Sequence, residues 1–235
     1  MSERSIRSTT HRLAIIDAAL RMEKIGLNKG TAGNISVRWN DGFLVTPSGM
    51  PPQRLRPEDI VFVDMEGDPQ GTRRPSSEWR FHRDIYAGRP EVEAVVHGHP
   101  PFCVALAVLH KSIPPYHYMV AKAGGRDIRC APYASFGTQA LSDHAMAALD
   151  DRKACLLANH GMIATGRTLD GAIALAIEVE ELAEGYWRAL QLGEPFLLSD
   201  EEMSSMVTRF AAYGENAQTG DQPAPAGHDK SGDRA

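Results

Sequence analysis

Two short apolar segments separated by a tight turn constrain the fold of this chain more than any other feature. Residues 34–39 and 42–46 have the β-branched and aromatic composition of strands, and they flank Asn40-Asp41-Gly42. A turn of this kind between two such segments is a strong short-range signal for an antiparallel β-hairpin. The chain is therefore expected to contain a sheet in which neighbouring strands run antiparallel.

Segments with strand and helix patterns alternate along the rest of the chain. Strands are expected near residues 59–64, 94–99, 128–133, 153–158 and 162–165, and helices near 11–25, 77–86, 102–109, 139–149, 168–192 and 200–213. This alternation predicts an α/β sandwich around a mostly antiparallel sheet. Residues 1–214 are expected to form one domain. Residues 215–235 lack apolar periodicity and are expected to form a disordered tail.

Charge and composition exclude several classes of partner. A net charge of −5 at pH 7 argues against nucleic acid or an anionic membrane as a partner. No apolar run approaches the ~20 residues that cross a bilayer, and the charged start lacks the features of a secretory signal. The 3 cysteines are widely spaced in apolar contexts, as expected of buried thiols in a reducing cytoplasm. We therefore expect a cytoplasmic protein.

Three histidines at strand ends are the candidate metal ligands. His97 and His99 are two residues apart, so on an extended segment their side chains project from one face, ~7 Å apart along the strand. His160 follows the apolar run 154–158, so it also stands at a strand end. Three neutral imidazoles with an open position are typical of catalytic zinc. Taken singly, each histidine also fits a packed polar residue at the end of a strand.

The segment Pro75-Ser76-Ser77-Glu78 precedes a predicted helix. Hydroxyls and free backbone N–H groups at a helix start form an anion site, so Ser76 and Ser77 are candidate phosphate ligands, and either serine is a candidate helix cap. Glu78 is explained equally well as a carboxylate that complements the helix dipole or as one that binds a metal or transfers a proton.

Two glycine-containing loops and one tyrosine complete the candidate residues. Gly33-Asn34 and Ser48-Gly49 combine close backbone approach with hydrogen-bonding side chains, which suits either a phosphate site or plain turns. Tyr118 lies between predicted helices, where it is either a proton donor or a packed aromatic.

In their order and spacing, these segments resemble the class II aldolase/adducin family. The similarity runs from about residue 11 to 214. The segments that carry it are 27–38, 46–49, 75–82, 95–99, 113–119, 130–138 and 159–161.

The resemblance implies a fold, an assembly and roles for individual residues. The fold would be a three-layer α/β/α sandwich, and the protein a homotetramer with active sites between subunits. Zn²⁺ would be the cofactor, with Mn²⁺ or Co²⁺ as alternatives. Glu78 would be the catalytic acid/base and a metal ligand in the empty enzyme, Tyr118 of a neighbouring subunit would exchange a proton with the aldehyde oxygen, and Tyr213 would close over the site. The metal ligands would be His97, His99 and His160, and the phosphate ligands Gly33, Asn34, Ser48, Gly49, Ser76 and Ser77.

The implied reaction is reversible cleavage of a ketose 1-phosphate to dihydroxyacetone phosphate and an aldehyde. The substrate would be L-fuculose 1-phosphate or a 5-deoxy or 5-alkylthio pentulose 1-phosphate. Gly98 and the run Pro100-Pro101-Phe102 depart from the family pattern beside the metal, which leaves the aldehyde half open, and Phe102 suits an apolar group. The alternatives are a sugar-phosphate 4-epimerase, a methylthioribulose-1-phosphate dehydratase and a non-catalytic adducin-like module. Glu78 favours the aldolase over the epimerase, which resembles this pattern but has aspartate there.

Overall fold

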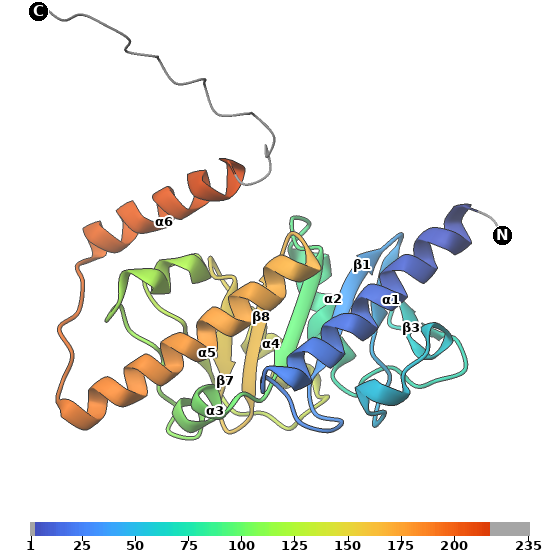
Figure 1. Ribbon diagram of the computed structural model, residues 1–235, viewed down its shortest axis with the longest axis horizontal. Coiled ribbons are helices and arrows are strands. Elements are labelled where there is room, and N and C mark those ends of the chain that lie inside the picture. The colour runs from blue at the N-terminus through green and yellow to red at the C-terminus, as the bar shows by residue number, and fades with distance from the viewer. Residues whose placement is uncertain (1–2, 217–235) are drawn as a thin grey trace, which may run out of the picture.

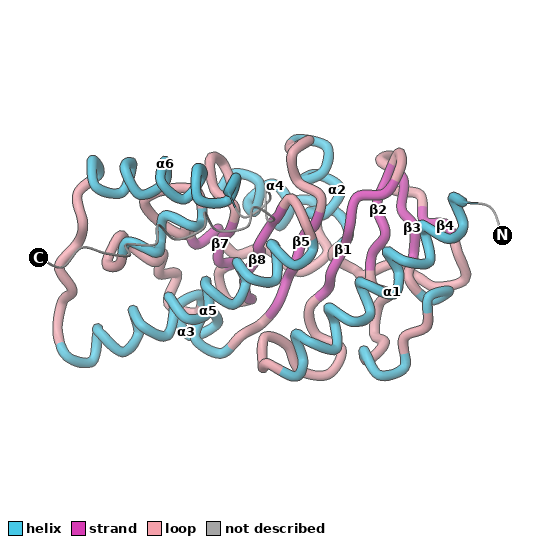
Figure 2. The backbone as a smooth tube through the Cα atoms, turned by 45° about the horizontal axis from the view of Figure 1, so that its top comes forward, coloured by secondary structure: helices cyan, strands magenta, loops and turns pink. Residues whose placement is uncertain are grey.

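An eight-stranded sheet forms the centre of the molecule (Figures 1 and 2). The computed structural model describes residues 3–216, with the side chains of residues 8–212. The strand order is β4-β3-β2-β1-β5-β8-β7-β6, and neighbours are antiparallel except the parallel pair β6 and β7. The strands are β1 (Asn34–Trp39), β2 (Gly42–Val45), β3 (Val61–Asp64), β4 (Pro69–Gln70), β5 (Ala94–Gly98), β6 (Cys130–Ala131), β7 (Ala154–Leu157) and β8 (Gly161–Gly166). The predicted antiparallel sheet is confirmed.

Helices cover both faces of this sheet, which gives the three layers that were expected. One face carries α1 (Glu3–Lys24), α3 (Pro101–Ala107) and α5 (Leu169–Leu192). The other face carries α2 (Trp79–Gly88) and α4 (Gln139–Ala148). The last described helix, α6 (Asp200–Asn216), packs on the 3₁₀ helix η3 (Tyr118–Ala123). None of the described helices is long and apolar enough to span a membrane.

Strand β5 lies in the interior of the sheet between β1 and β8, which explains its apolar composition. Ala94 and Val96 pack in the core beneath α1 and α5, while Val95 packs in the opposite core beneath α2 and α4. Both valines are fully buried, and burial of such a side chain contributes roughly 1.5–3 kcal/mol. This packing anchors the backbone immediately before His97.

The turns follow the local sequence. Asn40, the first residue of the two-residue turn between Trp39 and Gly42, has φ 50°, in the left-handed region that asparagine tolerates. The side chain of Thr168 accepts a hydrogen bond from the backbone N–H of Gly171 and so caps α5, as predicted.

Several predicted boundaries were wrong. Neither Ser76 nor Ser77 caps α2, because the helix begins at Trp79 and Glu78 occupies the N-cap position without a side-chain cap bond. The predicted strand at 128–133 shortens to β6, which pairs only with β7. The strand predicted from residue 59 starts at Val61, because Pro57–Asp59 form a 3₁₀ turn.

Residues 217–235 lie outside the described part of the chain, so the predicted tail and the domain limit at residue 214 stay predictions.

Candidate active site and metal centre

The sheet brings the three predicted metal-binding histidines together. His97 is the fourth residue of β5, His99 follows that strand, and His160 lies in the turn between β7 and β8. Because β5 pairs antiparallel with β8, with His97 opposite Ile163, the end of β5 lies beside the start of β8. One ring nitrogen from each histidine lies within 4.8 Å of the others.

The orientation of His97 is set by a backbone carbonyl. Its Nδ1 lies 2.9 Å from the carbonyl oxygen of Met162, so Nδ1 carries the proton and donates it. The lone pair of His97 is therefore on Nε2, which lies 3.0 Å from Nε2 of His99. Fixing the tautomer of a ligand through its second nitrogen is typical of metal-binding histidines.

The other two imidazoles are neutral near pH 7. Burial, followed by the nearby His97, lowers the pKa of His99 to about 3. Burial and His97 also lower the pKa of His160 to about 4. Neutral imidazole is the form that binds transition metals.

The carboxylate of Glu78 faces the ring nitrogens of these histidines. Its Oε2 lies 3.2 Å from Nε2 of His97, and its Oε1 lies 3.2 Å from Nε2 of His160. Burial raises the pKa of Glu78, but attraction to His97 when that ring is protonated, together with the amide of Asn34, outweighs that effect and holds the pKa below its usual range.

A divalent cation fits this arrangement. Glu78 Oε1 is fully buried and has no hydrogen-bond partner among the described residues. Imidazole nitrogens and carboxylate oxygens point their lone pairs toward one another here, and there are too few protons to form a hydrogen bond between each pair of atoms. Three nitrogens and one carboxylate form a donor set suited to Zn²⁺, Co²⁺ or Mn²⁺.

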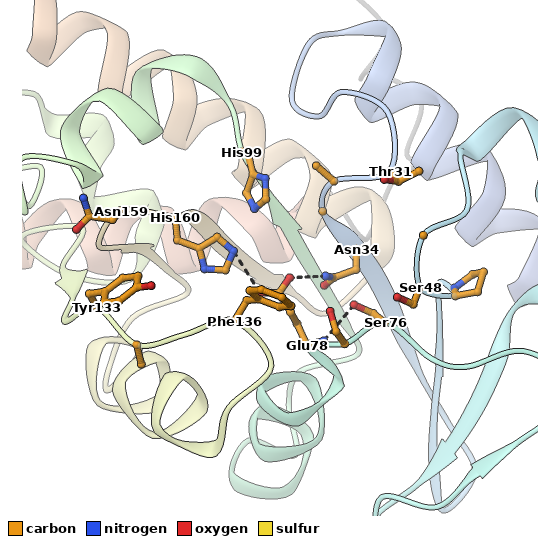
Figure 3. A pocket seen from close by; sticks show the side chains of 16 residues that line it. Thr31, Asn34, Ser48, Ser76, Glu78, His99, Tyr133, Phe136, Asn159 and His160 are labelled. Atoms are coloured by element: carbon orange, nitrogen blue, oxygen red, sulfur yellow. Dashed lines mark hydrogen bonds and ion pairs between the residues drawn. The ribbon is translucent and has the colours of Figure 1, made fainter.

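A cavity of about 360 Å³ opens beside these groups (Figure 3). It contains every phosphate ligand that was predicted, together with Glu78, His99 and His160. The lining residues are Thr31, Ala32, Gly33, Asn34, Pro47, Ser48, Gly49, Ser76, Ser77, Glu78, His99, Tyr133, Ala134, Phe136, Asn159 and His160.

Backbone hydrogen bonds hold the loops of the cavity against one another. The N–H of Ser76 donates to the carbonyl of Thr46, and the N–H of Ser48 donates to the carbonyl of Arg74. The hydroxyl of Ser76 accepts a hydrogen bond from the N–H of Glu78 at 3.3 Å. Gly33 and Gly49 have φ of 73° and 68°, which explains glycine at both turns. One wall of the cavity is therefore formed by these hydroxyl-bearing and glycine loops, and the other by Glu78, His99 and His160.

Tyr118, one of the two predicted catalytic tyrosines, is not among the lining residues. Tyr118 is 47% exposed and stacks on Phe210, with ring centroids 6.2 Å apart. The backbone of Tyr213 belongs to α6, but its side chain lies outside the described residues. The roles of both tyrosines stay predictions.

Phe102 is also absent from the cavity lining, contrary to its expected place beside the aldehyde. Its ring packs on Trp187 with centroids 5.5 Å apart, and its N–H donates to Oε1 of Glu180 at 2.9 Å. The large apolar groups of the cavity are instead Tyr133 and Phe136, which are 57% and 70% exposed. The sequence signal that could have found them is their place in the segment between a strand and the helix that Thr138 caps.

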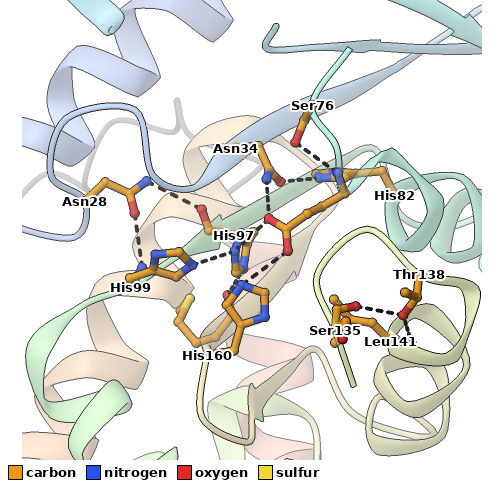
Figure 4. Close-up of polar contacts among 12 residues, drawn as sticks. Asn28, Asn34, Ser76, His82, His97, His99, Ser135, Thr138, Leu141 and His160 are labelled. Carbon is orange, nitrogen blue, oxygen red and sulfur yellow. Dashed lines mark hydrogen bonds and ion pairs between the residues drawn. The ribbon is translucent and has the colours of Figure 1, made fainter. Parts of the chain in front are cut away.

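Two polar residues near the site were not predicted. The side-chain oxygen of Asn28 accepts a hydrogen bond from the N–H of His99 at 3.1 Å, and its amide nitrogen lies 3.5 Å from the carbonyl of His97 (Figure 4). His82, within the predicted helix 77–86, is fully buried and contacts Asn34. Single asparagines and helical histidines carry no sequence signal for these contacts.

Comparison with known proteins identifies the family. Residues 13–187 match the class II aldolase and adducin N-terminal domain. The chain belongs to the class II aldolase/adducin family. The predicted family is thus confirmed.

Three proteins that are similar to this chain are named as aldolases. The chain is 61% identical over 213 residues to the 5-methylthioribulose-1-phosphate/5-deoxyribulose-1-phosphate aldolase of Rhodospirillum rubrum, covering 91% of this chain and 96% of the relative. It is 50% identical over 201 residues to the L-fuculose phosphate aldolase of Escherichia coli K12, covering 85% and 94%. A solved structure of an L-fuculose 1-phosphate aldolase superposes with a TM-score of 0.84 at 38% identity, covering 86% of this chain and 96% of that one.

Proposed function

We propose that this protein is a zinc-dependent class II aldolase that reversibly cleaves a ketose 1-phosphate to dihydroxyacetone phosphate and an aldehyde. The observation that carries the proposal is the cavity itself. A carboxylate and histidine nitrogens form one wall, and hydroxyl-bearing loops that include Ser48 and Ser76 form another. Such a cavity holds the phosphate at one end of a sugar and the reacting carbons at the other. Its relatives at 61% and 50% identity are named as aldolases.

His97, His99 and His160 would hold the zinc ion, with Mn²⁺ or Co²⁺ as substitutes. When bound, the ion would supply Lewis-acid stabilisation of the negative charge that develops on the ketose oxygens. The ring nitrogens that hold the ion must be unprotonated, and burial favours this form for His99 and His160.

Phosphate binding positions the substrate. The hydroxyls of Ser48, Ser76 and Ser77 and the amide of Asn34 donate hydrogen bonds to the phosphate oxygens, assisted by backbone N–H groups at Gly33 and Gly49. Neutral donors suffice to hold a phosphate, so the net charge of −5 is no obstacle. Anchoring one end of the sugar holds the reacting carbon near Glu78.

Two proton transfers complete the cleavage. The hydroxyl proton on C4 passes to the phenolate form of Tyr118 while the C3–C4 bond breaks, so the carbonyl of the aldehyde forms, and Tyr118 later returns that proton to solvent. The electron pair of that bond remains with the dihydroxyacetone phosphate fragment, and Glu78 then donates a proton to its C3. Glu78 lies at the buried end of the cavity, where its protonation state responds to the substrate's charge.

The same proposal includes an assembly. Tyr118 lies outside the cavity of its own chain and is half-exposed, so it is available to a neighbouring subunit. A homotetramer with active sites between subunits, in the cytoplasm, satisfies that requirement. The domain would comprise residues 1–214, and Tyr213 would close over the site.

We propose a 5-alkylthio or 5-deoxy pentulose 1-phosphate as the preferred substrate over L-fuculose 1-phosphate. Tyr133 and Phe136 present apolar rings to the cavity and suit an alkylthio or methyl end. The relative with 61% identity is named for these two substrates. Epimerase, dehydratase and non-catalytic functions are not favoured by the relatives.

A substrate panel tests this assignment. The zinc-loaded protein is incubated with 5-methylthioribulose, 5-deoxyribulose and L-fuculose 1-phosphates, and released dihydroxyacetone phosphate and aldehyde are quantified. Release is expected from all three, with the highest kcat/KM for the methylthio sugar. Phe136→Ala should reduce that preference. Formation of an epimer or a dehydrated product without dihydroxyacetone phosphate would replace the aldolase assignment.

A further inference from the structure

A continuous chain of buried polar groups runs from the interior of the sheet to Glu78, and Figure 4 shows its part around His82 and Asn34. Tyr86 OH lies 2.7 Å from Ser36 Oγ, which lies 2.6 Å from Nδ1 of His82. Nε2 of His82 lies 2.5 Å from Oδ1 of Asn34, whose Nδ2 donates to Oε2 of Glu78 at 2.9 Å. All five residues are at least nine-tenths buried, so water does not replace these contacts.

The chain exists because two elements face each other in register. Glu78, His82 and Tyr86 are spaced by four residues at the start and along one face of α2. Asn34 and Ser36 are two residues apart and therefore share one face of β1. The side chains of α2 and β1 alternate along the chain of hydrogen bonds.

The carboxylate of Glu78 fixes the direction of every bond in this chain. An ionised carboxylate only accepts, so Asn34 must turn its amide nitrogen toward Oε2 and its carbonyl oxygen toward His82. Nε2 of His82 then carries the proton that it donates to Asn34. Nδ1 of the neutral ring accepts from the hydroxyl of Ser36, which in turn accepts from the hydroxyl of Tyr86.

The same hydrogen bonds also constrain Glu78 when they are followed from His82 outward. A hydrogen-bond donor at His82 Nε2 is compatible with only one orientation of the Asn34 amide. That orientation points Nδ2 of Asn34, which also lines the cavity, at Oε2 of Glu78. Oε2 of Glu78 is thereby held in a hydrogen bond, whereas Oε1 has no hydrogen-bond partner among the described residues.

We propose that His82 is a positioning residue for the reaction. With Ser36 and Tyr86 behind it, His82 locks Asn34 so that a hydrogen bond to Oε2 holds the carboxylate of Glu78 in one orientation. This proposal rests on the acid/base role of Glu78 in the proposed function.

Two substitutions at His82 separate positioning from packing. His82→Leu fills the space but removes both ring nitrogens. His82→Gln keeps an N–H donor that reaches Asn34. Proton exchange at C3 of dihydroxyacetone phosphate is measured by NMR in deuterated buffer with zinc-loaded protein.

For folded His82→Leu we expect the exchange rate constant to fall about 10- to 100-fold, the range found for partners that orient active-site ligands. Bound zinc should stay close to wild type, because the three metal-binding histidines are unchanged, and KM should change less than the exchange rate, because the three serine hydroxyls still hold the phosphate when the amide of Asn34 turns. His82→Gln should recover most of the rate. Wild-type exchange in folded His82→Leu, or equal loss in both variants, would overturn the proposal.

A second pair of variants controls for the loss of a buried hydroxyl. Tyr86→Phe removes the first donor of the chain and should slow exchange. Tyr116→Phe removes a hydroxyl that donates to the carbonyl of Leu182, away from the chain, and should leave exchange unchanged. Equal rates for these two variants would exclude a contribution from Tyr86.

Nitrogen-15 NMR of metal-free protein tests the same chain without activity. The His82 signals, assigned by their absence in His82→Gln, should show a protonated Nε2 and a bare Nδ1. The opposite tautomer would overturn the proposal even if His82→Leu does not fold. Absence of exchange in wild-type protein, with the expected tautomer present, would instead count against the proposed function.

Discussion

Gly98 and Asn28 occupy adjoining space behind the metal-binding histidines. A Cβ on Gly98 would lie 3.0 Å from Oδ1 of Asn28 and 3.0 Å from the carbonyl oxygen of Leu27. The same Oδ1 accepts the N–H of His99. The glycine between the two histidines therefore makes room for the side chain that fixes the backbone at His99.

This relationship predicts the effect of Gly98→Ala. The methyl group should displace Asn28, loosen the backbone of His99 and weaken zinc binding about 10-fold, as for other residues that orient metal ligands. Zinc affinity is measured by competition with a chromophoric chelator. Gly88→Ala is the control, because a Cβ there would meet only the flexible end of Met146. Unchanged affinity in Gly98→Ala would show that Asn28 does not position His99.

Removal of the metal should abolish cleavage. Protein treated with a chelator should lose turnover and regain it when Zn²⁺ is added. His160→Ala should lose turnover even with added Zn²⁺, because three imidazoles are needed to hold the ion. Zinc at a hundredfold excess over its Kd should also stabilise the fold by about 2.7 kcal/mol. Thermal unfolding with and without zinc measures this. Full turnover by the stripped protein would refute the role of the metal.

Glu78→Gln should retain zinc but lose proton transfer. The amide preserves the shape of the side chain and removes the titrating group, so exchange at C3 should fall by about 10²–10⁴-fold. Exchange is followed by NMR, and zinc content by elemental analysis. An unchanged exchange rate would remove the acid/base role from Glu78.

Substitution of Ser76 and of Ser77 by alanine should affect KM and kcat differently. Each hydroxyl is proposed to donate to phosphate, and a hydrogen bond to a charged group contributes about 1.5–3 kcal/mol, so Ser77→Ala should raise KM roughly 10- to 100-fold. Ser76→Ala should also lower kcat, because the hydroxyl of Ser76 accepts the N–H of Glu78. Steady-state kinetics distinguish the two. If both substitutions raise KM and leave kcat unchanged, the contact of Ser76 with Glu78 does not contribute to catalysis.

Stability should fall as the pH is lowered, in part through His82. Burial, then the adjacent His97, lowers the pKa of His82 to about 3 from its ordinary 6.5. The unfolded chain therefore takes up this proton below pH 6.5 while the folded chain does not, so the stabilisation is fully present above that pH and is lost toward pH 3. One such group contributes a slope of at most about 1.4 kcal/mol per pH unit.

Urea unfolding of metal-free protein between pH 7 and 4 measures that slope. His82→Gln should show a shallower dependence on pH than wild type, because the amide does not titrate. The difference between the two curves isolates His82 from the other histidines. Parallel curves would mean that His82 does not titrate between the folded and unfolded states.

Local sequence was sufficient for the features that depend on neighbouring residues. The turn at Asn40 and the cap at Thr168 follow from residue types at fixed spacing. The same is true of His97 and His99, because the two-residue repeat of a strand puts both side chains on one face. The strand end at 154–158 indicated His160 as a third candidate ligand, and the family resemblance then favoured Glu78 as a partner, since neither residue lies near the pair in the sequence.

Contacts between distant segments could not be predicted in this way. Ser76 and Ser77 were predicted as helix caps, but α2 starts later because Ser76 is held by the strand edge at Thr46. Phe102 was expected in the cavity, but Trp187 and Glu180 of α5 hold it elsewhere. In both cases a long-range contact outweighed a local preference.

The sequence by itself determined the antiparallel hairpin, the order of strands and helices, the family and the three histidines of the metal site. Only the tertiary structure decided that Asn28 holds His99, that His82 reaches Glu78 through Asn34, and that Tyr133 and Phe136 line the cavity. The physical reason is that strand and turn preferences act between near neighbours. The direction of a buried hydrogen bond, in contrast, depends on which donor and acceptor the packing of two separate elements brings together.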